Sequence, residues 1–345
     1  DWSSDVCSSD LNYYYPFGQI QRNKYFVVRR FYKFLKYVKT IGLLRRLNRE
    51  DKTIAIYIYT NLLLTHLFSW LLAKMTRSKL IIEGNEHPLR HFQANAFRKT
   101  VGLIKFYIEA YFSDGIFCIS HYLVDFHKSK GISEKKLFLV PSTVDPARFY
   151  QTNQTVAAQS YIGYFGGLTF YRDNVDLLIK AFAQISKKHD EVLLVLGGFC
   201  SDEEQKQITG LISELKIKDK VKLLGYIERE EVTRYIVNAK ILVMVRSNNL
   251  EAKASYPSKL SEFLASSRPV ISVNVGEIPL YITDGVNAFL VEPENVEALA
   301  AKIEYVIGNY ELAKEVGLRG KELTDTIFNY NYQGKRMIEH IQSLN

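Results

Sequence analysis

The feature that most constrains the fold is a regular alternation of short apolar runs with helical stretches, which begins at Thr53. The apolar runs are rich in Val, Ile and Leu and do not alternate with polar residues, as in strands that are buried on both faces. Strands of this kind that are joined by helices form parallel sheets covered on both sides. We expect strands at 53–59, 79–84, 115–120, 136–141, 161–166, 191–198, 221–226, 239–245, 269–274 and 288–293.

The alternation is interrupted at 142–159 by a polar, irregular segment that contains a proline. We interpret this segment as a linker. We therefore predict two Rossmann-like domains, at 12–150 and 151–325. A helical tail is expected from about 311 to 342, and its end, the C-terminal helix at 326–345, is expected to pack back on the first domain. Ligands bind outside the carboxyl ends of parallel strands, so a site is expected in the cleft between the domains.

The start of the chain is expected to be incomplete. Only three strand–helix units precede the linker, fewer than a doubly wound domain normally has. The first eleven residues, DWSSDVCSSDL at 1–11, resemble the translation of a sequencing adapter. We expect them to be an artefactual leader and the natural N-terminus to be missing. The sequence therefore does not decide whether a signal peptide or an anchor lies upstream.

The composition is that of a soluble globular protein, with 47% hydrophobic and 24% charged residues. The longest apolar run, at 62–73, is too short to span a bilayer. The three cysteines have neither a metal-binding spacing nor a disulfide framework, which predicts a reducing compartment such as the cytoplasm; they are Cys7, Cys118 and Cys200.

Positive charge is concentrated in the first half of the chain. Residues 12–150 contain 23 Lys and Arg against 9 Asp and Glu, whereas residues 151–345 contain 22 against 25. Residues 22–49 alone contain ten Lys and Arg and no acidic residue. Apolar residues recur there at a spacing of three or four, which predicts a basic amphipathic helix on an anionic membrane surface. The alternatives are a helix packed against the first sheet and a nucleic-acid-binding segment, and no recognised motif supports the latter.

Features suited to ligand binding lie at the expected strand ends of the second domain. Gly166 and Gly167 follow the first strand there, and glycines let backbone N–H groups approach a phosphate, which Arg172 would hold from the next helix. Tyr226 follows another strand and would flank a base, with a surface turn as the alternative. Arg246 follows a further strand and would point to the same place.

A further feature is the stretch YPSKLSEFLASSRPVI, which predicts a helix that starts near Ser258 and leads into a strand. Lys259 and Glu262 lie three residues apart at the start of this helix. A lysine is unfavourable at the positive end of a helix dipole unless an anion is also bound there. The pattern therefore indicates an anion site, with a solvated helix face as the alternative.

From about Asp114 to the C-terminus, roughly two thirds of its length, the chain resembles the retaining glycosyltransferases of family 4, also called group 1, which have the GT-B fold. The motifs that carry the resemblance occur in the family's order: DGIFCIS, VPSTVDPARF, YFGGLTFYRDNVDLLIKAF and SYPSKLSEFLASSRPVISVNVGEIPLYITDGVNAFLVEP. The resemblance implies an α/β protein whose two parallel sheets face a cleft.

The resemblance also implies a donor site for a nucleotide-sugar in the second domain. Glu262 is then expected to receive the ribose hydroxyls, and Lys259 and Arg172 are expected to face the diphosphate, with Ser258 beside them. The anion that the helix start requires would be the pyrophosphate of the donor.

The sequence departs from the family at two positions of this site. Gly167 stands where the family has an arginine, and Ala254 stands where it has the first glutamate of a pair. These departures put sugar selectivity in doubt. Lys253 or Arg246 is expected to replace the lost charge.

On the first domain, Glu86 and His87 follow the strand at 79–84. The family often has a histidine at about this position, close to the transferred sugar. Either residue would orient the acceptor or stabilise positive charge on the sugar, with a structural histidine as the alternative for His87. The sequence has no Asp-x-Asp motif, so we expect no metal and no cofactor, and cationic side chains would stabilise the leaving diphosphate.

The expected function is transfer of a sugar, with retention, from a nucleotide-sugar to a glycan or polyprenyl-linked acceptor. The expected setting is surface-polysaccharide biosynthesis at the inner face of a bacterial cell membrane, with the protein bound peripherally through residues 22–49. The alternatives are a catalytically inactive sugar-nucleotide or glycan-binding protein and a GT-B epimerase or phosphorylase. No nucleic-acid partner is expected.

Overall fold

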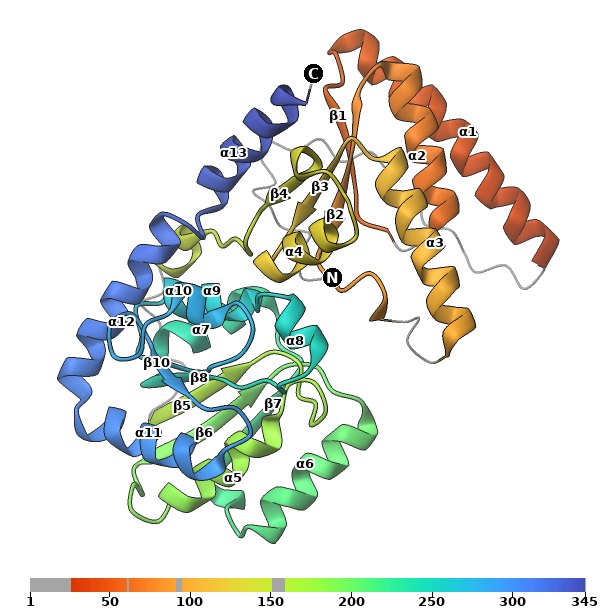
Figure 1. The fold of residues 1–345 in the computed structure, drawn as a ribbon. Coiled ribbons are helices and arrows are strands. Elements are labelled where there is room, and N and C mark those ends of the chain that lie inside the picture. Colours follow the sequence, from red (N-terminus) through yellow and green to blue (C-terminus); the bar gives the residue numbers. More distant parts are fainter. Residues whose placement is uncertain (1–25, 61, 91–94, 151–158, 345) are drawn as a thin grey trace.

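The computed structural model describes residues 26–60, 62–90, 95–150 and 159–344, with side chains from residue 37 onward. These residues form two α/β domains, each built on a parallel sheet (Figure 1). The two sheets lie apart in the chain as well as in space, because the first contains β1 to β4 and the second contains β5 to β10.

The first domain has a four-stranded sheet in the order β1-β2-β3-β4. Its strands are β1 (Ala55–Ile58), β2 (Lys79–Gly84), β3 (Gly115–Cys118) and β4 (Leu137–Leu139). Its helices are α1 (Phe26–Glu50), α2 (Leu63–Thr76), α3 (Ala96–Phe112) and α4 (His121–Ser129). Helix α2 contacts both α1 and α3, and the three helices lie side by side (Figure 1).

The second domain has a six-stranded parallel sheet in the order β10-β9-β8-β5-β6-β7. Its strands are β5 (Ser160–Phe165), β6 (Val192–Gly197), β7 (Val221–Gly225), β8 (Ile241–Met244), β9 (Val270–Val273) and β10 (Phe289–Val291). Its helices are α5 (Val175–Ile185), α6 (Asp202–Glu214), α7 (Arg229–Asn238), α8 (Leu250–Ala254), α9 (Ser258–Ala265), α10 (Ile278–Tyr281) and α11 (Val296–Gly308).

The strand order of the second sheet reverses between β5 and β8. From β5 the chain proceeds outward through β6 and β7, and it then returns to the other side of β5 to form β8, β9 and β10. The loops after β5 and β8 diverge at such a switch point, and this is where open parallel sheets bind ligands.

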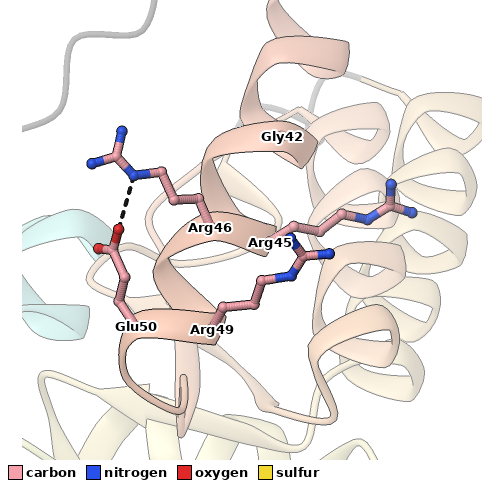
Figure 2. Close-up of a pocket in the computed structure, with 5 residues that line it drawn as sticks. All are labelled: Gly42, Arg45, Arg46, Arg49 and Glu50. Carbon is pink, nitrogen blue, oxygen red and sulfur yellow. Dashed lines mark hydrogen bonds and ion pairs between the residues drawn. The ribbon is translucent and has the colours of Figure 1, made fainter.

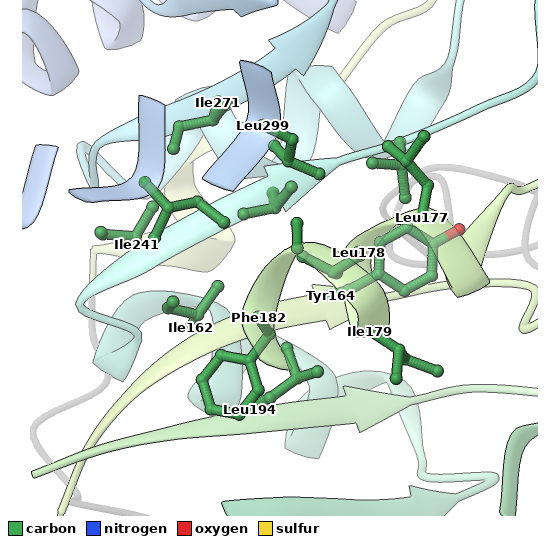
Figure 3. Close-up of a cluster of buried hydrophobic side chains, with 14 of the residues drawn as sticks. Ile162, Tyr164, Leu177, Leu178, Ile179, Phe182, Leu194, Ile241, Ile271 and Leu299 are labelled. Atoms are coloured by element: carbon green, nitrogen blue, oxygen red, sulfur yellow. The ribbon is translucent and has the colours of Figure 1, made fainter. Parts of the chain in front are cut away.

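Buried side chains fill both faces of the second sheet. On one face Ile162 and Tyr164 of β5 pack with Leu178 and Phe182 of α5 (Figure 3). The opposite face is a second cluster that includes Phe165, Tyr235 and Phe263, from β5, α7 and α9. Continuous burial of β5 on both faces explains why its sequence has no polar alternation.

Each of the ten predicted strands is present, and the structure differs from the sequence prediction chiefly in the C-terminal helices. The helix expected from 311 to 342 is divided into α12 (Tyr310–Asp325) and α13 (Tyr330–Ser343). The division lets Phe328 enter the core, where it is fully buried and its ring stacks at 4.9 Å on that of Tyr256. The short helices α8 and α10 were not predicted, because periodicity cannot define a helix of one turn.

Helix α13 packs against the sheet of the first domain. The ring of His340 stacks on Phe138 of β4 with 4.3 Å between centroids. The guanidinium of Arg336 lies 4.8 Å from the same ring. Lys79 Nζ, at the start of β2, donates a 2.6 Å hydrogen bond to the carbonyl of Leu344. The C-terminal end of the chain therefore connects the two domains.

Helix α1 contains the described part of the basic segment and separates apolar from polar residues only weakly. Tyr37 packs on Phe68 of α2, with 4.3 Å between ring centroids, whereas Val38 is 47% exposed. The described part of this helix is therefore packed on α2, and its contact with an anionic membrane stays a prediction. Residues 22–25 lie outside the described residues, as do the side chains of 26–36. None of the described helices has the length and hydrophobicity needed to cross a bilayer.

Candidate active site

The loops after β5, β6 and β7 lie side by side at the carboxyl edge of the second sheet. Gly166 N donates to the Gly197 carbonyl at 2.9 Å, and Gly198 N donates to the Gly225 carbonyl at 2.8 Å. A Cβ on Gly198 would lie 1.7 Å from the carbonyl oxygen of Gly166, and Gly198 has a φ of +145°. The two glycines therefore allow backbone to approach backbone at the switch point.

Lys259 lies directly on Gly166. A Cβ at Gly166 would lie between 2.2 and 2.5 Å from the last three atoms of the Lys259 side chain. Helix α9 begins one residue before Lys259, and its first turn is placed over the glycine loop by the burial of Leu260 and Phe263. The lysine that the sequence places at a helix start is therefore brought to the glycine loop that follows β5.

A buried carboxylate holds the Lys259 ammonium in place. Lys259 Nζ lies 2.9 Å from Asp173 Oδ1 and donates to the Tyr164 hydroxyl at 3.0 Å. Asp173 is 8% exposed, and its other oxygen accepts from Thr169 Oγ1 at 2.9 Å. Burial lowers the pKa of Lys259, and Asp173 opposes that shift.

Two arginines increase the positive charge around Lys259. Arg246, after β8, is 8% exposed, and its Nη2 donates to Ser255 Oγ at 3.1 Å. Its Nη1 is buried and has no hydrogen-bond partner within the described residues. Burial, and then the charge of Arg172, lower the pKa of Arg246 to about 10. Arg172 itself is exposed, just before α5.

Glu262 lies one turn after Lys259 and is paired with a residue that sequence reasoning did not select. Arg148 Nη1 donates to Glu262 Oε1 at 3.3 Å, and Arg148 Nη2 donates to Thr233 Oγ1 at 3.2 Å. The Glu262 side chain stays 22% exposed. Arg148 lies within the quoted motif VPSTVDPARF, but its partner is 114 residues away, so no local pattern identifies it.

The other predicted donor residues lie at the surface. Lys253 and Ser258 are exposed, as is Tyr226, which is 63% exposed at the end of β7. Phe199, which sequence reasoning did not select, is 69% exposed at the end of the neighbouring strand β6. Two aromatic rings thus stand exposed at adjacent strand ends, where a planar base would find a stacking surface.

On the first domain, the predicted pair Glu86 and His87 have different surroundings. Glu86 forms an ion pair with Arg90 at 2.5 Å. His87 is 7% exposed, its ring centroid is 4.5 Å from that of Phe126, and its Nδ1 accepts from Leu89 N at 3.2 Å. Burial lowers the pKa of His87. This packing is the one expected of a structural histidine, the alternative for His87, and a role for His87 beside the transferred sugar stays a prediction.

Tyr59, just after β1, links this region to the second domain. Burial raises the pKa of Tyr59, as do the charges of Glu86 and Glu83, whereas Arg90 and Arg172 lower it. Arg172 belongs to the second domain, so its field reaches the tyrosine from across the domain junction.

The domains are joined at α4 by a carboxylate that sequence reasoning missed. Glu277, after β9, is 3% exposed and accepts from the backbone N–H groups of His121 at 2.9 Å and Tyr122 at 3.1 Å. It also lies 2.8 Å from His121 Nδ1. Beside it, Ser120 Oγ donates to the carbonyl of Ala254 at 2.7 Å. A residue of the second domain therefore caps a helix of the first.

Comparison with known proteins decides the family. Residues 151–323 match the model of the glycosyl transferases group 1. The chain belongs to this family. The proteins that it is similar to include N-acetyl-alpha-D-glucosaminyl L-malate synthase from Bacillus anthracis. This relative is 26% identical over 230 residues, covering 64% of this chain and 56% of that protein.

A second relative is the amylovoran biosynthesis glycosyltransferase AmsK from Erwinia amylovora. It is 26% identical over 141 residues, covering 41% of this chain and 35% of that protein. The chain thus spans about half or less of the length of the curated group 1 relatives it matches.

Solved structures of glycosyltransferases are similar over most of the chain. HepE from Anabaena, in complex with UDP-glucose, has a TM-score of 0.70 at 17% identity, covering 88% of this chain and 82% of that chain. A glycosyltransferase from Rickettsia africae has a TM-score of 0.69 at 18% identity, covering 94% and 84%. This group 1 protein therefore has the GT-B fold, as its sequence predicted.

Proposed function

We propose that this chain transfers a sugar from a nucleotide-sugar donor to a glycan or polyprenyl-linked acceptor. The observation that carries the proposal is the group of three cations, Arg172, Arg246 and Lys259, at the switch point of the second sheet. A nucleotide-sugar reacts by releasing a nucleoside diphosphate. Cations that are already held in place stabilise the negative charge that develops on that leaving group.

The donor would lie with its diphosphate over the glycine loop and its ribose toward α9. Lys259 lies on Gly166, so its ammonium would face a phosphate that lies over that loop. Glu262, one turn further along α9, would accept from two ribose hydroxyls, with Arg148 orienting its carboxylate. Tyr226 and Phe199 would flank the base.

Arg246 would replace the charge that the family has at the positions of Gly167 and Ala254. Gly167 has no side chain, and Ala254 is fully buried, so neither position supplies a charge to a donor site. Arg246 Nη1 is a buried donor without a partner among the residues that the structure describes, and such a group gains more than an exposed one when an anion reaches it. We therefore assign Arg246 to the diphosphate.

Transfer would proceed with retention and without a metal ion, by attack of the acceptor on the face that the diphosphate leaves. Glu86 would orient the acceptor from the first domain. The setting would be surface-polysaccharide biosynthesis in a bacterium, at the inner face of the cell membrane, with a hexose as the transferred sugar.

The test is calorimetry of the full chain with UDP, GDP and ADP and with the matching nucleosides, followed by release of the diphosphate from UDP-glucose and other nucleotide-sugars. We expect at least one diphosphate to bind more tightly than its nucleoside, and its nucleotide-sugar to be turned over. Binding without turnover would favour an inactive sugar-nucleotide-binding protein, and absence of binding would overturn the proposal.

Replacing Glu262 by glutamine tests the ribose contact. The change keeps the size of the side chain and removes its charge, and a charge-assisted hydrogen bond contributes about 1.5–3 kcal/mol. Affinity for the nucleoside and for its diphosphate should fall about tenfold to a hundredfold in calorimetry. Glu231→Gln, on the exposed face of α7, is the matched control. Normal nucleoside binding by Glu262→Gln would show that Glu262 serves only its ion pair with Arg148.

The proposed membrane contact can be tested at the basic surface of α1. Arg45, Arg46 and Arg49 line a shallow surface pocket with Gly42 and Glu50 (Figure 2). Each cation near an anionic leaflet contributes about 1 kcal/mol. Replacing the three arginines by glutamine should therefore reduce cosedimentation with phosphatidylglycerol vesicles, most strongly at low salt.

The matched control for this charge change lies in the other domain. Lys206, Lys218 and Lys222 are exposed there, and replacing all three by glutamine should leave vesicle binding unchanged. If both triple variants lose binding equally, only net charge matters and α1 is not the contact.

A further inference from the structure

The outward face of α3 is apolar along its length. Its exposed side chains recur at helical spacing, and the stripe, which we call the α3 stripe, consists of Phe97, Val101, Ile104 and Tyr111, which are 76%, 41%, 56% and 78% exposed. The opposite face of the helix is the buried one and contains Gly102, Phe106 and Ala110. The outward face of a helix at the surface of a soluble domain normally carries polar and charged side chains.

The charged residues of α3 lie beside the stripe and not within it. Lys105 and Glu109 neutralise each other at 2.9 Å, with side chains only 20% and 15% exposed. Arg98 and Lys99 are exposed at the first turn. The helix therefore presents an uncharged apolar strip with exposed cations at the end where the helix begins.

Nothing within the described residues covers the α3 stripe. Helix α2 packs along one side of α3, and α1 packs on the far side of α2 (Figure 1). On α2 itself Leu64 and Leu71 are 78% and 46% exposed. Exposed apolar side chains therefore occur on both of these neighbouring helices, and large exposed apolar patches mark interaction sites.

We propose that the α3 stripe inserts into the interfacial layer of an anionic lipid bilayer, an inference that rests on the proposed transfer to a membrane-borne acceptor. The exposed cations of α3, Arg98 and Lys99, have the sign that this partner requires, and residues 12–150 as a whole contain 23 Lys and Arg against 9 Asp and Glu. The stripe has an aromatic ring near each end, Phe97 and Tyr111, and aromatic rings favour the depth of the lipid headgroups. Apolar burial and attraction of cations to anionic lipids add in such surfaces.

A second copy of the chain fits the surface less well. A symmetric dimer through α3 would place the same patch of each protomer face to face. It would therefore bring Arg98 and Lys99 of one protomer close to the basic first domain of the other, where like charges repel. An anionic bilayer covers the same apolar area and neutralises these cations.

The proposed contact also positions the candidate site. In a strand–helix–strand unit the helix runs back from the carboxyl edge of the sheet, so α3 begins on the side where β2 ends and where Glu86 lies. Insertion of α3 would hold this edge of the first domain at the level of the lipid headgroups. The phosphate of a polyprenyl-linked acceptor lies at that level.

The experiment measures binding of the full chain to vesicles of phosphatidylcholine with phosphatidylglycerol. In the test variant Phe97, Ile104 and Tyr111 are all replaced by glutamine, and we expect its partition to fall at least about thirtyfold, because the apolar part of the binding energy is removed. The double variant Phe97→Trp, Tyr111→Trp should bind vesicles like the wild type, and its fluorescence should shift to the blue on vesicles.

The control triple lies in the second domain and replaces Tyr305, Leu312 and Leu318, which are 47%, 46% and 57% exposed, by glutamine. It should bind vesicles like the wild type. Thermal unfolding and calorimetry with nucleoside diphosphates should be unchanged in both triples, because all six side chains are exposed and lie away from the donor site.

Wild-type vesicle binding by the α3 triple overturns the proposal. So does a wild-type dimer that dissociates in the α3 triple, because the stripe is then a protein interface. A wild-type chain that binds vesicles through α3 but binds no nucleotide supports the surface and defeats the proposed function, so the two failures are distinguishable.

Discussion

Replacing Lys259 by methionine is expected to weaken binding of a nucleoside diphosphate about a hundredfold while leaving the nucleoside unaffected. Two effects act in the same direction. The variant loses a charge-assisted contact to phosphate, worth about 1.5–3 kcal/mol. It also leaves the buried carboxylate of Asp173, now 2.9 Å from the ammonium, without its cation and close to the incoming anion.

Calorimetry on three further variants separates these effects. Asp173→Asn combined with Lys259→Met should recover part of the lost affinity, because the repulsion is removed and only the missing attraction remains. Arg246→Met should weaken the diphosphate in the same selective way. Lys206→Met, on the exposed face of α6, is the control. If Lys259→Met weakens nucleoside and diphosphate equally, the pyrophosphate assignment is wrong.

Replacing Gly198 by alanine is expected to destabilise the second domain by about 3 kcal/mol or more. The new Cβ would lie 1.7 Å from the carbonyl oxygen of Gly166, and the φ of +145° is one that alanine rarely adopts. Since neither backbone segment can move without breaking the loop hydrogen bonds, we expect the unfolding temperature to fall by at least about 6 °C in a thermal scan.

Gly210→Ala is the matched control for this prediction. Gly210 lies on α6, and a Cβ there would meet nothing within 4 Å. Alanine in a helix interior is favoured over glycine by roughly 0.5–1 kcal/mol, so this variant should unfold at a slightly higher temperature than the wild type. Unchanged stability of Gly198→Ala would contradict the close approach of the two loops.

Most of the fold follows from local sequence patterns. Continuous Val, Ile and Leu runs predicted ten strands, and the interruption before residue 160 separated the two sheets. The prediction failed where local pattern is silent. One helix was expected where α12 and α13 occur, since only the tertiary core, which takes up Phe328 beside Tyr256, requires the chain to turn there.

The sequence predicted the kind of site but not which side chains contact each other in it. The glycine loop and the start of α9 could be identified, because a turn after a strand and a cation at a helix start are local features. Three pairings were not identified: Lys259 with Asp173, Glu262 with Arg148, and Glu277 with the start of α4, which join residues 86, 114 and 156 positions apart. Periodicity contains no information on such contacts.

The sequence by itself determined the two parallel sheets, the glycine loop at a strand end and the placement of Lys259 and Glu262 on one helix. It could do so because strand, helix and turn preferences act over a few residues. Only the tertiary structure decided that His87 is buried against Phe126 and that α3 turns its apolar side outward. It also decided that Arg246 Nη1 is buried without a hydrogen-bond partner among the described residues. Burial and charge pairing depend on which distant elements pack together, and a single sequence does not state this.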